Sequence, residues 1–242
     1  MKTAIVTGGS RGIGLGVVKM LVRKGYCVIA SYAHDDTAVS RAREELGRLQ
    51  DFVEFVKADH SLRDDTYDFI RRVERMTIDS GIDCIVCNAG ITVRKAFTET
   101  TDADWDAMME VAVNAHMIML RELYPRINHG CRIIFTGSAM AVYPHATVTG
   151  YGITKAAVHA MVKNLVKVME PKQATVNAVA PGFVDTEWQK NKPEEIRRNI
   201  CAKTAIHRFA SIEETVAAYA FCIDNAFVNG SIIEVNGGYS YK

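Results

Sequence analysis

Short apolar runs rich in β-branched residues recur along the whole chain, and segments of helical length separate them. Seven of these runs are expected to be β-strands: Thr3–Val6, Cys27–Ala30, Phe52–Val56, Cys84–Cys87, Arg132–Phe135, Ala174–Val179 and Ile232–Val235. Strands separated by helix-length segments need crossover connections, because a hairpin joins its strands by a short turn. The pattern therefore predicts an α/β protein with a doubly wound, seven-stranded parallel sheet and helices on both of its faces.

The chain is expected to form one domain over residues 1–242. No internal repeat, low-complexity segment or Pro- or Ser-rich linker divides it. The segment after the first strand has helical spacing, with Ile13, Val17 and Met20 on one stripe, and Gly25 is a suitable end for that helix. Residues 182–203 are polar and irregular, and they lie between a strand and a helix. We expect a substrate loop there, although a plain solvent-exposed connection has the same composition.

Composition limits the partners of the protein. Twenty-nine Lys and Arg against 28 Asp and Glu give a net charge of +1, so no strong field recruits nucleic acid or an anionic membrane. No apolar stretch reaches the length of about 20 residues that spans a bilayer, and the N-terminus lacks a secretory pattern. The expected partner is a small molecule, and the expected compartment is the cytoplasm.

The six cysteines have no dense, regular spacing and are expected to be reduced core residues. Cys84 and Cys87 form a C-x-x-C pair inside a predicted strand. Their odd separation places them on opposite faces of the sheet. This favours a structural role over redox or metal chemistry, and no metal site is expected.

A cluster of glycines joins the first strand to the first helix. Thr7 to Gly14 reads TGGSRGIG, with the spacing G-x-x-x-G-x-G. Glycine lets the backbone approach a pyrophosphate, whose charge the amides at a helix N-terminus stabilise. Ordinary turns also use glycine, but the strand-turn-helix context favours a dinucleotide site. The expected contacts are Gly8, Ser10, Arg11, Gly12, Ile13 and Gly14.

The end of the second strand is expected to select between NADP(H) and NAD(H). An acidic side chain there would bind the ribose hydroxyls of NAD and repel a 2′-phosphate, whereas this sequence has the neutral Ser31. Arg11 is expected to supply positive charge to a 2′-phosphate, and His34 a hydrogen bond. Asp35 and Asp36 leave an alternative open: a longer strand would bring one of them to the ribose, and a shorter strand leaves both at the start of the next helix. NADP(H) is the expected cofactor and NAD(H) the alternative.

Tyr151 and Lys155 form the strongest chemical signal in the chain. They are four residues apart in a segment with helical spacing, so both project from one helical face. An ammonium near a phenol stabilises the phenolate and lowers the pKa of the phenol towards the working pH. Tyr151 is thus a candidate general acid in reduction and general base in oxidation. A surface tyrosine next to a solvated lysine would have the same spacing.

Ordered landmarks along nearly the whole chain resemble the short-chain dehydrogenase/reductase family. They are Thr7 to Gly14, Asp59, Asn88-Ala89-Gly90, Asn114, Ser138, Tyr151, Lys155 and Pro181-Gly182. Within the family the chain is most similar to 3-oxoacyl-(acyl carrier protein) reductases, through NAGIT at 88–92, APGF at 180–183 and EVNGG at 234–238. The resemblance implies a Rossmann-like fold and a homotetramer, with a homodimer as the smaller assembly.

The resemblance also implies a role for each catalytic landmark. Ser138 would hydrogen-bond the substrate oxygen, Tyr151 would protonate it, and Lys155 would hold the nicotinamide ribose and tune Tyr151. Asn114 would anchor a water relay to Lys155. Taken singly, Ser138 is also a loop hydroxyl and Asn114 a polar group that bends a helix.

Further landmarks would contact the nucleotide by the same resemblance. Asp59 would lie by the adenine, although alone it also reads as a helix cap. The remaining cofactor contacts implied are Asn88, Ala89 and Gly90 after the fourth strand, and Pro181, Gly182, Val184 and Thr186 around the nicotinamide carboxamide.

Three positions depart from the family pattern. Cys87 stands where many members have an asparagine, and His60 replaces the usual aliphatic residue after Asp59. Gln173 occupies a turn position where relatives often carry glycine.

Taken together, these features predict NADP(H)-dependent hydride transfer between the nicotinamide and a ketone or secondary alcohol. A 3-oxoacyl thioester is one candidate substrate, with an acyl carrier protein as a possible partner, and a sugar or diketone is another. The alternative from a different class is a catalytically silent nucleotide-binding regulatory protein, because a fold does not determine a function.

Overall fold

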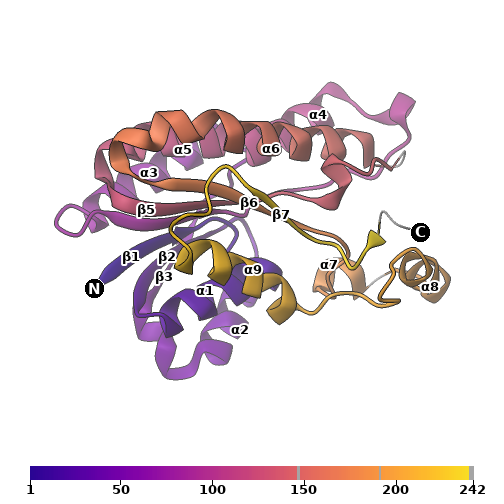
Figure 1. Cartoon of the computed structure of the whole chain (residues 1–242), viewed down its shortest axis with the longest axis horizontal. Coiled ribbons are helices and arrows are strands. Elements are labelled where there is room, and N and C mark those ends of the chain that lie inside the picture. Colours follow the sequence, from indigo (N-terminus) through magenta and orange to yellow (C-terminus); the bar gives the residue numbers. More distant parts are fainter. Residues whose placement is uncertain (146–147, 191, 240–242) are drawn as a thin grey trace.

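Seven parallel strands form one sheet in the computed structural model, which describes residues 1–145, 148–190 and 192–239. The strands are β1 (Lys2–Val6), β2 (Tyr26–Tyr32), β3 (Val53–Lys57), β4 (Ile82–Cys87), β5 (Ile127–Thr136), β6 (Thr175–Pro181) and β7 (Ile232–Val235). Their order across the sheet is β3-β2-β1-β4-β5-β6-β7, and every neighbouring pair is parallel. All seven predicted strands and the doubly wound sheet are therefore confirmed (Figure 1).

Helices cover both faces of this sheet (Figure 1). They are α1 (Gly12–Arg23), α2 (Asp36–Leu46), α3 (Arg63–Met76), α4 (Asp102–Met109), α5 (Ala115–Leu123), α6 (Thr149–Met169), α7 (Glu187–Lys190), α8 (Glu194–Ala202) and α9 (Ile212–Asp224). Shorter helical turns are η1 (Gly47–Phe52), η2 (Phe97–Glu99), η3 (Glu110–Asn114), η4 (Tyr124–Arg126), η5 (Ala139–Ala141) and η7 (Glu170–Lys172). Helices α3, α5 and α6 lie on one face, and α1, α2 and α9 lie on the other.

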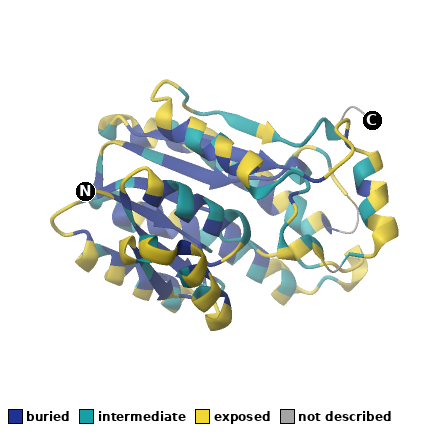
Figure 2. Ribbon diagram, turned by 90° about the horizontal axis from the view of Figure 1, so that it is seen from below, coloured by how far each residue is buried: buried dark blue, intermediate teal, exposed yellow. Residues whose placement is uncertain are grey.

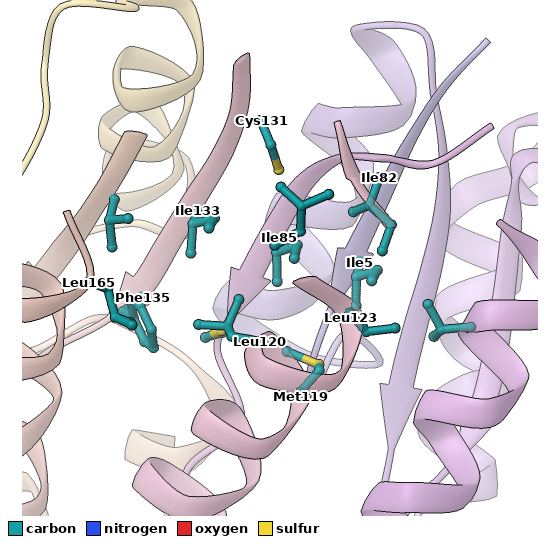
Figure 3. Packing of buried hydrophobic residues seen from close by; sticks show 14 of the residues in the cluster. Ile5, Ile82, Ile85, Met119, Leu120, Leu123, Cys131, Ile133, Phe135 and Leu165 are labelled. Atoms are coloured by element: carbon teal, nitrogen blue, oxygen red, sulfur yellow. The ribbon is translucent and has the colours of Figure 1, made fainter. Parts of the chain in front are cut away.

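Each face of the sheet has its own apolar core. Ile85 and Ile133 pack against Leu120 and Leu123 of α5 on the first face (Figure 3). The central strands are buried on both sides, the edge strand β7 is only partly buried, and many exposed residues lie on the outer surfaces of the helices (Figure 2). A parallel sheet needs this double cover, which explains why its strands read as continuous apolar runs.

The two cysteines of the C-x-x-C pair lie on opposite faces, as predicted. Cys84 belongs to the core beneath α1 and α9, whereas Cys87 belongs to the core beneath α3, α5 and α6. Both are buried and neither is in a disulfide. Their side chains cannot meet, because successive residues of a strand point to opposite faces.

Two segments depart from regular α-helix or from the predicted pattern. Between α4 and α5 the helix runs on through the π-helical turn η3, where the regular α-helical hydrogen bonding is interrupted. The irregular stretch predicted at 182–203 contains the short helices α7 and α8, whose polar composition hid them. Gly25 follows α1 with a φ of 84°, and Gln173 has a φ of 50°, so both occupy the left-handed conformation that glycine adopts most readily.

The topology fixes where a ligand binds. After β1 the chain builds outward through β2 and β3, and it then returns to place β4 on the other side of β1. Such a reversal opens a crevice at the carboxyl ends of the two central strands. Helices α7 and α8 follow β6 and lie beyond that edge of the sheet (Figure 1). Among the described residues, no helix is both long and apolar enough to span a membrane.

Candidate active site

The glycine turn between β1 and α1 has a backbone that only glycine allows. Gly8 and Gly12 have φ values of 65° and 56°. A Cβ on Gly14 would lie 2.1 Å from the carbonyl oxygen of Gly8, which is far inside the contact distance. At these glycine positions no side chain covers the turn, so that a ligand can reach its backbone.

The N-terminus of α1 fits an anion such as a pyrophosphate. Arg11 occupies the N-cap without a side-chain hydrogen bond to the helix, and the first turn contains no acidic residue. The first backbone N–H groups of a helix lack partners within the helix, and its dipole attracts negative charge. Thr186, in the loop after β6, lies beside this turn, since a Cβ on Gly12 would be 3.6 Å from its methyl carbon.

Residues that follow β1 and β4 tie the turn to the centre of the sheet. The hydroxyl of Thr7 accepts hydrogen bonds from the backbone N–H groups of Asn88 and Ala89, both at 2.9 Å. The amide of Asn88 donates to the carbonyl oxygens of Thr7 and Gly8 at 3.0 and 3.1 Å. The structure therefore brings these predicted contacts together at the switch point of the sheet.

The end of β2 is arranged differently from the simplest expectation. Ser31 is fully buried, and its hydroxyl accepts a hydrogen bond from the backbone N–H of Gly8 at 3.2 Å, so it supports the turn from behind. Asp35 caps α2 by accepting from the N–H of Ala38, and Asp36 is the first residue of that helix. Both acids therefore lie at the start of the helix, which is the second of the two alternatives.

Two basic side chains lie near the same end of β2. Arg11 pairs with Asp35 at 3.4 Å, and both groups are exposed. His34 contacts the carboxylate of Asp59 at 2.9 Å. Asp59 also accepts from the N–H and hydroxyl of Ser61, and although burial alone would raise its pKa, these contacts hold it below its usual value. Asp59 thus fixes the conformation of the loop after β3.

Ser138, Tyr151 and Lys155 come together where β5 and α6 meet. Ser138 follows β5, and its side chain hydrogen-bonds the phenol of Tyr151. The ammonium of Lys155 is 5.7 Å from the centre of the Tyr151 ring and donates to the carbonyl oxygen of Thr136 at 2.6 Å. A Cβ on Gly90 would lie 3.3 Å from the same ammonium, so the loop after β4 borders this group.

Burial shifts the pKa of both titratable groups. It raises the pKa of the Tyr151 phenol above its usual value, although the hydrogen bond from Ser138 and the charge of Arg94 act in the opposite direction. This net direction corrects the expectation that a lysine neighbour brings the pKa of Tyr151 down. The reason is that desolvation of the phenolate outweighs the favourable contacts. Burial also lowers the pKa of Lys155 to about 8.

Asn114 is the last residue of the π-helical turn η3, which packs against α6. Its amide donates to the carboxylate of Glu110 at 2.7 Å, and Glu110 also pairs with Arg63 at 2.8 Å. π-turns recur at functional sites because they change the register of a helix. The structure thus gives Asn114 a fixed orientation next to α6.

The loop after β6 lies against β7 and the C-terminal segment. Pro181 ends β6, and the N–H of Gly182 donates to the carbonyl oxygen of Val235 at 2.9 Å. Val184 forms a parallel bridge with Ala210. The backbone that follows β6 is thereby anchored before α7 and α8 begin.

Sequence reasoning missed Arg94, which follows β4 and exerts its charge on both Tyr151 and Lys192. Arg94 is exposed, and it has no ion pair with any described residue. The sequence signal that could have identified Arg94 is its position in the loop after β4, because ligands of such sheets bind at the carboxyl ends of the strands. Within the described ranges, no group of three or more His, Cys, Asp or Glu side chains could hold a metal ion.

Comparison with known proteins identifies the family. Residues 2–197 match the family model described as "short chain dehydrogenase". The chain is a short-chain dehydrogenase/reductase. It is 32% identical over 247 residues to 2-dehydro-3-deoxy-D-gluconate 5-dehydrogenase of Pseudoalteromonas atlantica, covering 98% of this chain and 95% of that protein. It is 27% identical over 244 residues to a 3-oxoacyl-[acyl-carrier-protein] reductase of Thermotoga maritima, covering 98% of this chain and 97% of that protein.

A solved structure agrees with this assignment. A short-chain dehydrogenase from Burkholderia cenocepacia in complex with NADP superimposes with a TM-score of 0.91 at 28% identity, covering 99% of this chain and 98% of that one. The fold is thus that of a short-chain dehydrogenase/reductase. This protein is an NAD(P)-dependent oxidoreductase that acts on CH–OH and C=O groups.

Proposed function

We propose that this short-chain dehydrogenase/reductase uses NADP(H) to reduce a ketone, or to oxidise the corresponding secondary alcohol. The observation that carries the proposal is the meeting of Ser138, Tyr151 and Lys155 beside a glycine turn whose helix N-terminus is free of side-chain caps. When bound there, NADP(H) supplies or accepts the hydride at its nicotinamide. The protein contributes binding, orientation and proton transfer.

Each catalytic side chain has one task in this proposal. Ser138 donates a hydrogen bond to the carbonyl oxygen, and the Tyr151 hydroxyl gives that oxygen its proton during reduction. The raised pKa of Tyr151 keeps the phenol protonated, which suits a general acid. Lys155 is buried and places its positive charge 5.7 Å from the centre of the phenol ring, so it stabilises the phenolate that proton transfer leaves behind. Asn114 anchors the water relay proposed to lead to Lys155.

The cofactor residues form a second part of the proposal. Gly8, Ser10, Gly12, Ile13 and Gly14 offer backbone to the pyrophosphate, with Ser31 holding Gly8 from behind. The remaining proposed contacts are Asp59 at the adenine, Asn88, Ala89 and Gly90 along the nucleotide, and Pro181, Gly182, Val184 and Thr186 at the carboxamide.

We expect kcat/KM with NADPH to exceed that with NADH by about tenfold or more, since a charge-assisted hydrogen bond to a 2′-phosphate contributes about 1.5–3 kcal/mol. Arg11 is the proposed source of this charge because its side chain reaches from the N-cap of α1 to Asp35, in the segment after β2. Asp35 and Asp36 are themselves held at the start of α2. Steady-state rates with each coenzyme measure the ratio. Arg11→Gln should lower it, whereas a parent enzyme that prefers NADH would contradict the assignment.

Two substrate classes follow from different observations. The resemblance to 3-oxoacyl-(acyl carrier protein) reductases supports a 3-oxoacyl thioester. The position of Arg94 supports instead a carbonyl compound that carries a carboxylate, such as a sugar acid. The positive charge of Arg94 acts at Tyr151 and Lys192, so it is placed to attract the carboxylate of such a substrate. The gluconate-type relative is named for a substrate of that second kind.

Arg94→Gln tests the carboxylate class. We expect kcat/KM for a keto acid to fall about 10–100-fold relative to a neutral ketone of similar size, since a hydrogen bond to a charged group is lost. Lys95→Gln is the matched control, because Lys95 is the next residue but pairs with Asp104 at 2.5 Å. Equal losses for the acidic and the neutral substrate would exclude recognition of a carboxylate by Arg94.

The enzyme must also be distinguished from a catalytically silent nucleotide-binding protein. Purified protein would be incubated with NADPH and a panel of 3-oxoacyl thioesters, keto acids, diketones and sugars. Oxidation of NADPH with any class supports the proposed function and identifies the substrate group. NADPH binding without oxidation across the panel would support the regulatory alternative.

The proposal also covers the oligomeric state, a protein partner and the cellular compartment. Trp105 and Met117 of the α4–α5 region and Ile153 and Val168 of α6 are between 37% and 52% exposed, which supports packing against a second subunit in a homodimer or homotetramer. An acyl carrier protein remains a proposed partner for the thioester class. The six unpaired cysteines support a cytoplasmic location.

A further inference from the structure

Two buried histidines lie directly behind the glycine turn. His116, at the start of α5, is 2% exposed, and His60, in the loop after β3, is 5% exposed. Each ring nitrogen in both side chains has a hydrogen-bond partner. Buried imidazoles with both nitrogens occupied hold one orientation, and they can fix the groups that they contact.

The contacts of His116 define its protonation. Nδ1 lies 3.0 Å from the carbonyl oxygen of Ala112, which can only accept, so Nδ1 carries the hydrogen. Nε2 lies 2.9 Å from the hydroxyl of Thr7. Burial lowers the pKa of His116 to about 3, so the ring is neutral and Nε2 is an acceptor. Thr7 therefore donates its only hydroxyl hydrogen to His116.

This direction leaves the Thr7 oxygen free to accept. It takes the backbone N–H groups of Asn88 and Ala89, both at 2.9 Å. The Thr7 hydroxyl has one donor and two acceptor positions, and these three contacts use all of them. A protonated or absent imidazole at position 116 would therefore disturb the hydrogen bonds of Thr7 to Asn88 and Ala89 as well. The contact joins α5 to the loops after β1 and β4, which are the loops proposed to hold the nucleotide.

His60 supports the neighbouring part of the turn. Its Nε2 lies 2.8 Å from the hydroxyl of Ser31, which accepts from the N–H of Gly8, and its Nδ1 lies 3.1 Å from the hydroxyl of Thr66. The ring meets Phe69 edge to face at a centroid distance of 5.4 Å. The replacement of an aliphatic residue by His60 thus adds a polar contact inside the core.

We propose that His116 and His60 are positioning residues for the coenzyme: as neutral imidazoles they hold Thr7, Gly8 and the Asn88–Ala89 backbone in the arrangement that the dinucleotide binds. The inference rests on the proposed function, because it concerns the same nucleotide site. Neither histidine needs to touch the coenzyme. His116 acts through Thr7, and His60 acts through Ser31.

His116→Phe tests the stronger of the two contacts, because it keeps a planar ring and removes both nitrogens. We expect the Kd of the coenzyme to rise about tenfold, as one buried hydroxyl loses its partner, with kcat at saturating coenzyme falling less than threefold. Binding is measured by fluorescence titration with whichever of NADPH and NADH the parent protein binds. The readout needs no turnover, so an unidentified substrate or an inactive enzyme does not affect it. His60→Phe should give a smaller rise of the same kind.

Three further variants separate positioning from general destabilisation. Met119→Leu, a substitution of a buried core residue on the same helix, should leave the Kd within twofold. In Thr7→Val the partner of His116 is gone, so adding His116→Phe should raise the Kd no further. His116→Gln retains an acceptor for Thr7 and should bind within threefold of the parent, which provides the test if the Phe variant does not fold. An unchanged Kd in His116→Phe, additive effects with Thr7→Val, or a tenfold rise in a folded His116→Gln would each overturn the proposal.

Discussion

Tyr151→Phe is expected to lower kcat by about 10²–10⁴-fold, which is the range that a positioned general acid contributes. The substitution removes only the hydroxyl, so the ring that packs near Lys155 stays in place. NADPH affinity should remain within about twofold of that of the parent, because no proposed phosphate contact is lost. Single-turnover oxidation of NADPH with the best substrate of the panel measures the chemical step, and fluorescence titration measures binding.

Tyr124→Phe serves as the matched control for this experiment. Tyr124 begins η4 and lies beneath the ammonium of Lys172, away from the catalytic group. Its loss of a hydroxyl should leave turnover unchanged. If Tyr151→Phe turned over substrate as fast as the parent, the proton would have to come from elsewhere, and the proposed role of Tyr151 would be wrong.

The free energy of unfolding is expected to fall on acidification, by about 2 kcal/mol at pH 5 for each fully buried histidine. Burial lowers the pKa of His116 to about 3 and of His60 to about 4, from an ordinary value of 6.5. Between the folded and the unfolded pKa, the unfolded chain binds more protons than the folded protein. Stability is therefore complete above pH 6.5 and declines as the pH falls towards the folded pKa values.

Urea unfolding at pH 7.5 and pH 5, at one protein concentration, measures this effect. Carboxylates also contribute to acid sensitivity, so the informative quantity is the difference between the parent and His116→Gln. We expect the variant to lose about 2 kcal/mol less than the parent over this interval. Equal losses in the two proteins would show that His116 is not held neutral by the fold.

Much of the candidate site was visible in the chain because its landmarks occupy the ends of strands. The residues after β1, β4, β5 and β6 converge at one edge of any parallel sheet in this order, and Thr7 to Gly14, Asn88, Ser138 and Gly182 do so here. The common face of Tyr151 and Lys155 could also be predicted from the sequence, since four residues make about one helical turn. Their side chains lie on one face of α6, as the spacing predicts.

Other features depended on groups that the sequence keeps far apart. The sequence shows that Ser31 is neutral, but only the fold buries its hydroxyl and brings the N–H of Gly8 to it. The direction of the Tyr151 pKa shift likewise needed the burial of the phenol, which is a property of its surroundings. Arg94 gained its significance only when the loops after β4 and β6 were found to bring it towards Tyr151 and Lys192.

The sequence by itself determined the strands, the parallel sheet, the glycine turn and the spacing of the catalytic pair, because these depend on periodicity and on residues close along the chain. The tertiary structure alone decided which buried polar groups meet. Thr7 and His116 are 109 residues apart, and their hydrogen bond exists because β1 and α5 pack on the same sheet. Such contacts carry no local pattern, since any buried hydroxyl satisfies an imidazole that the fold places beside it.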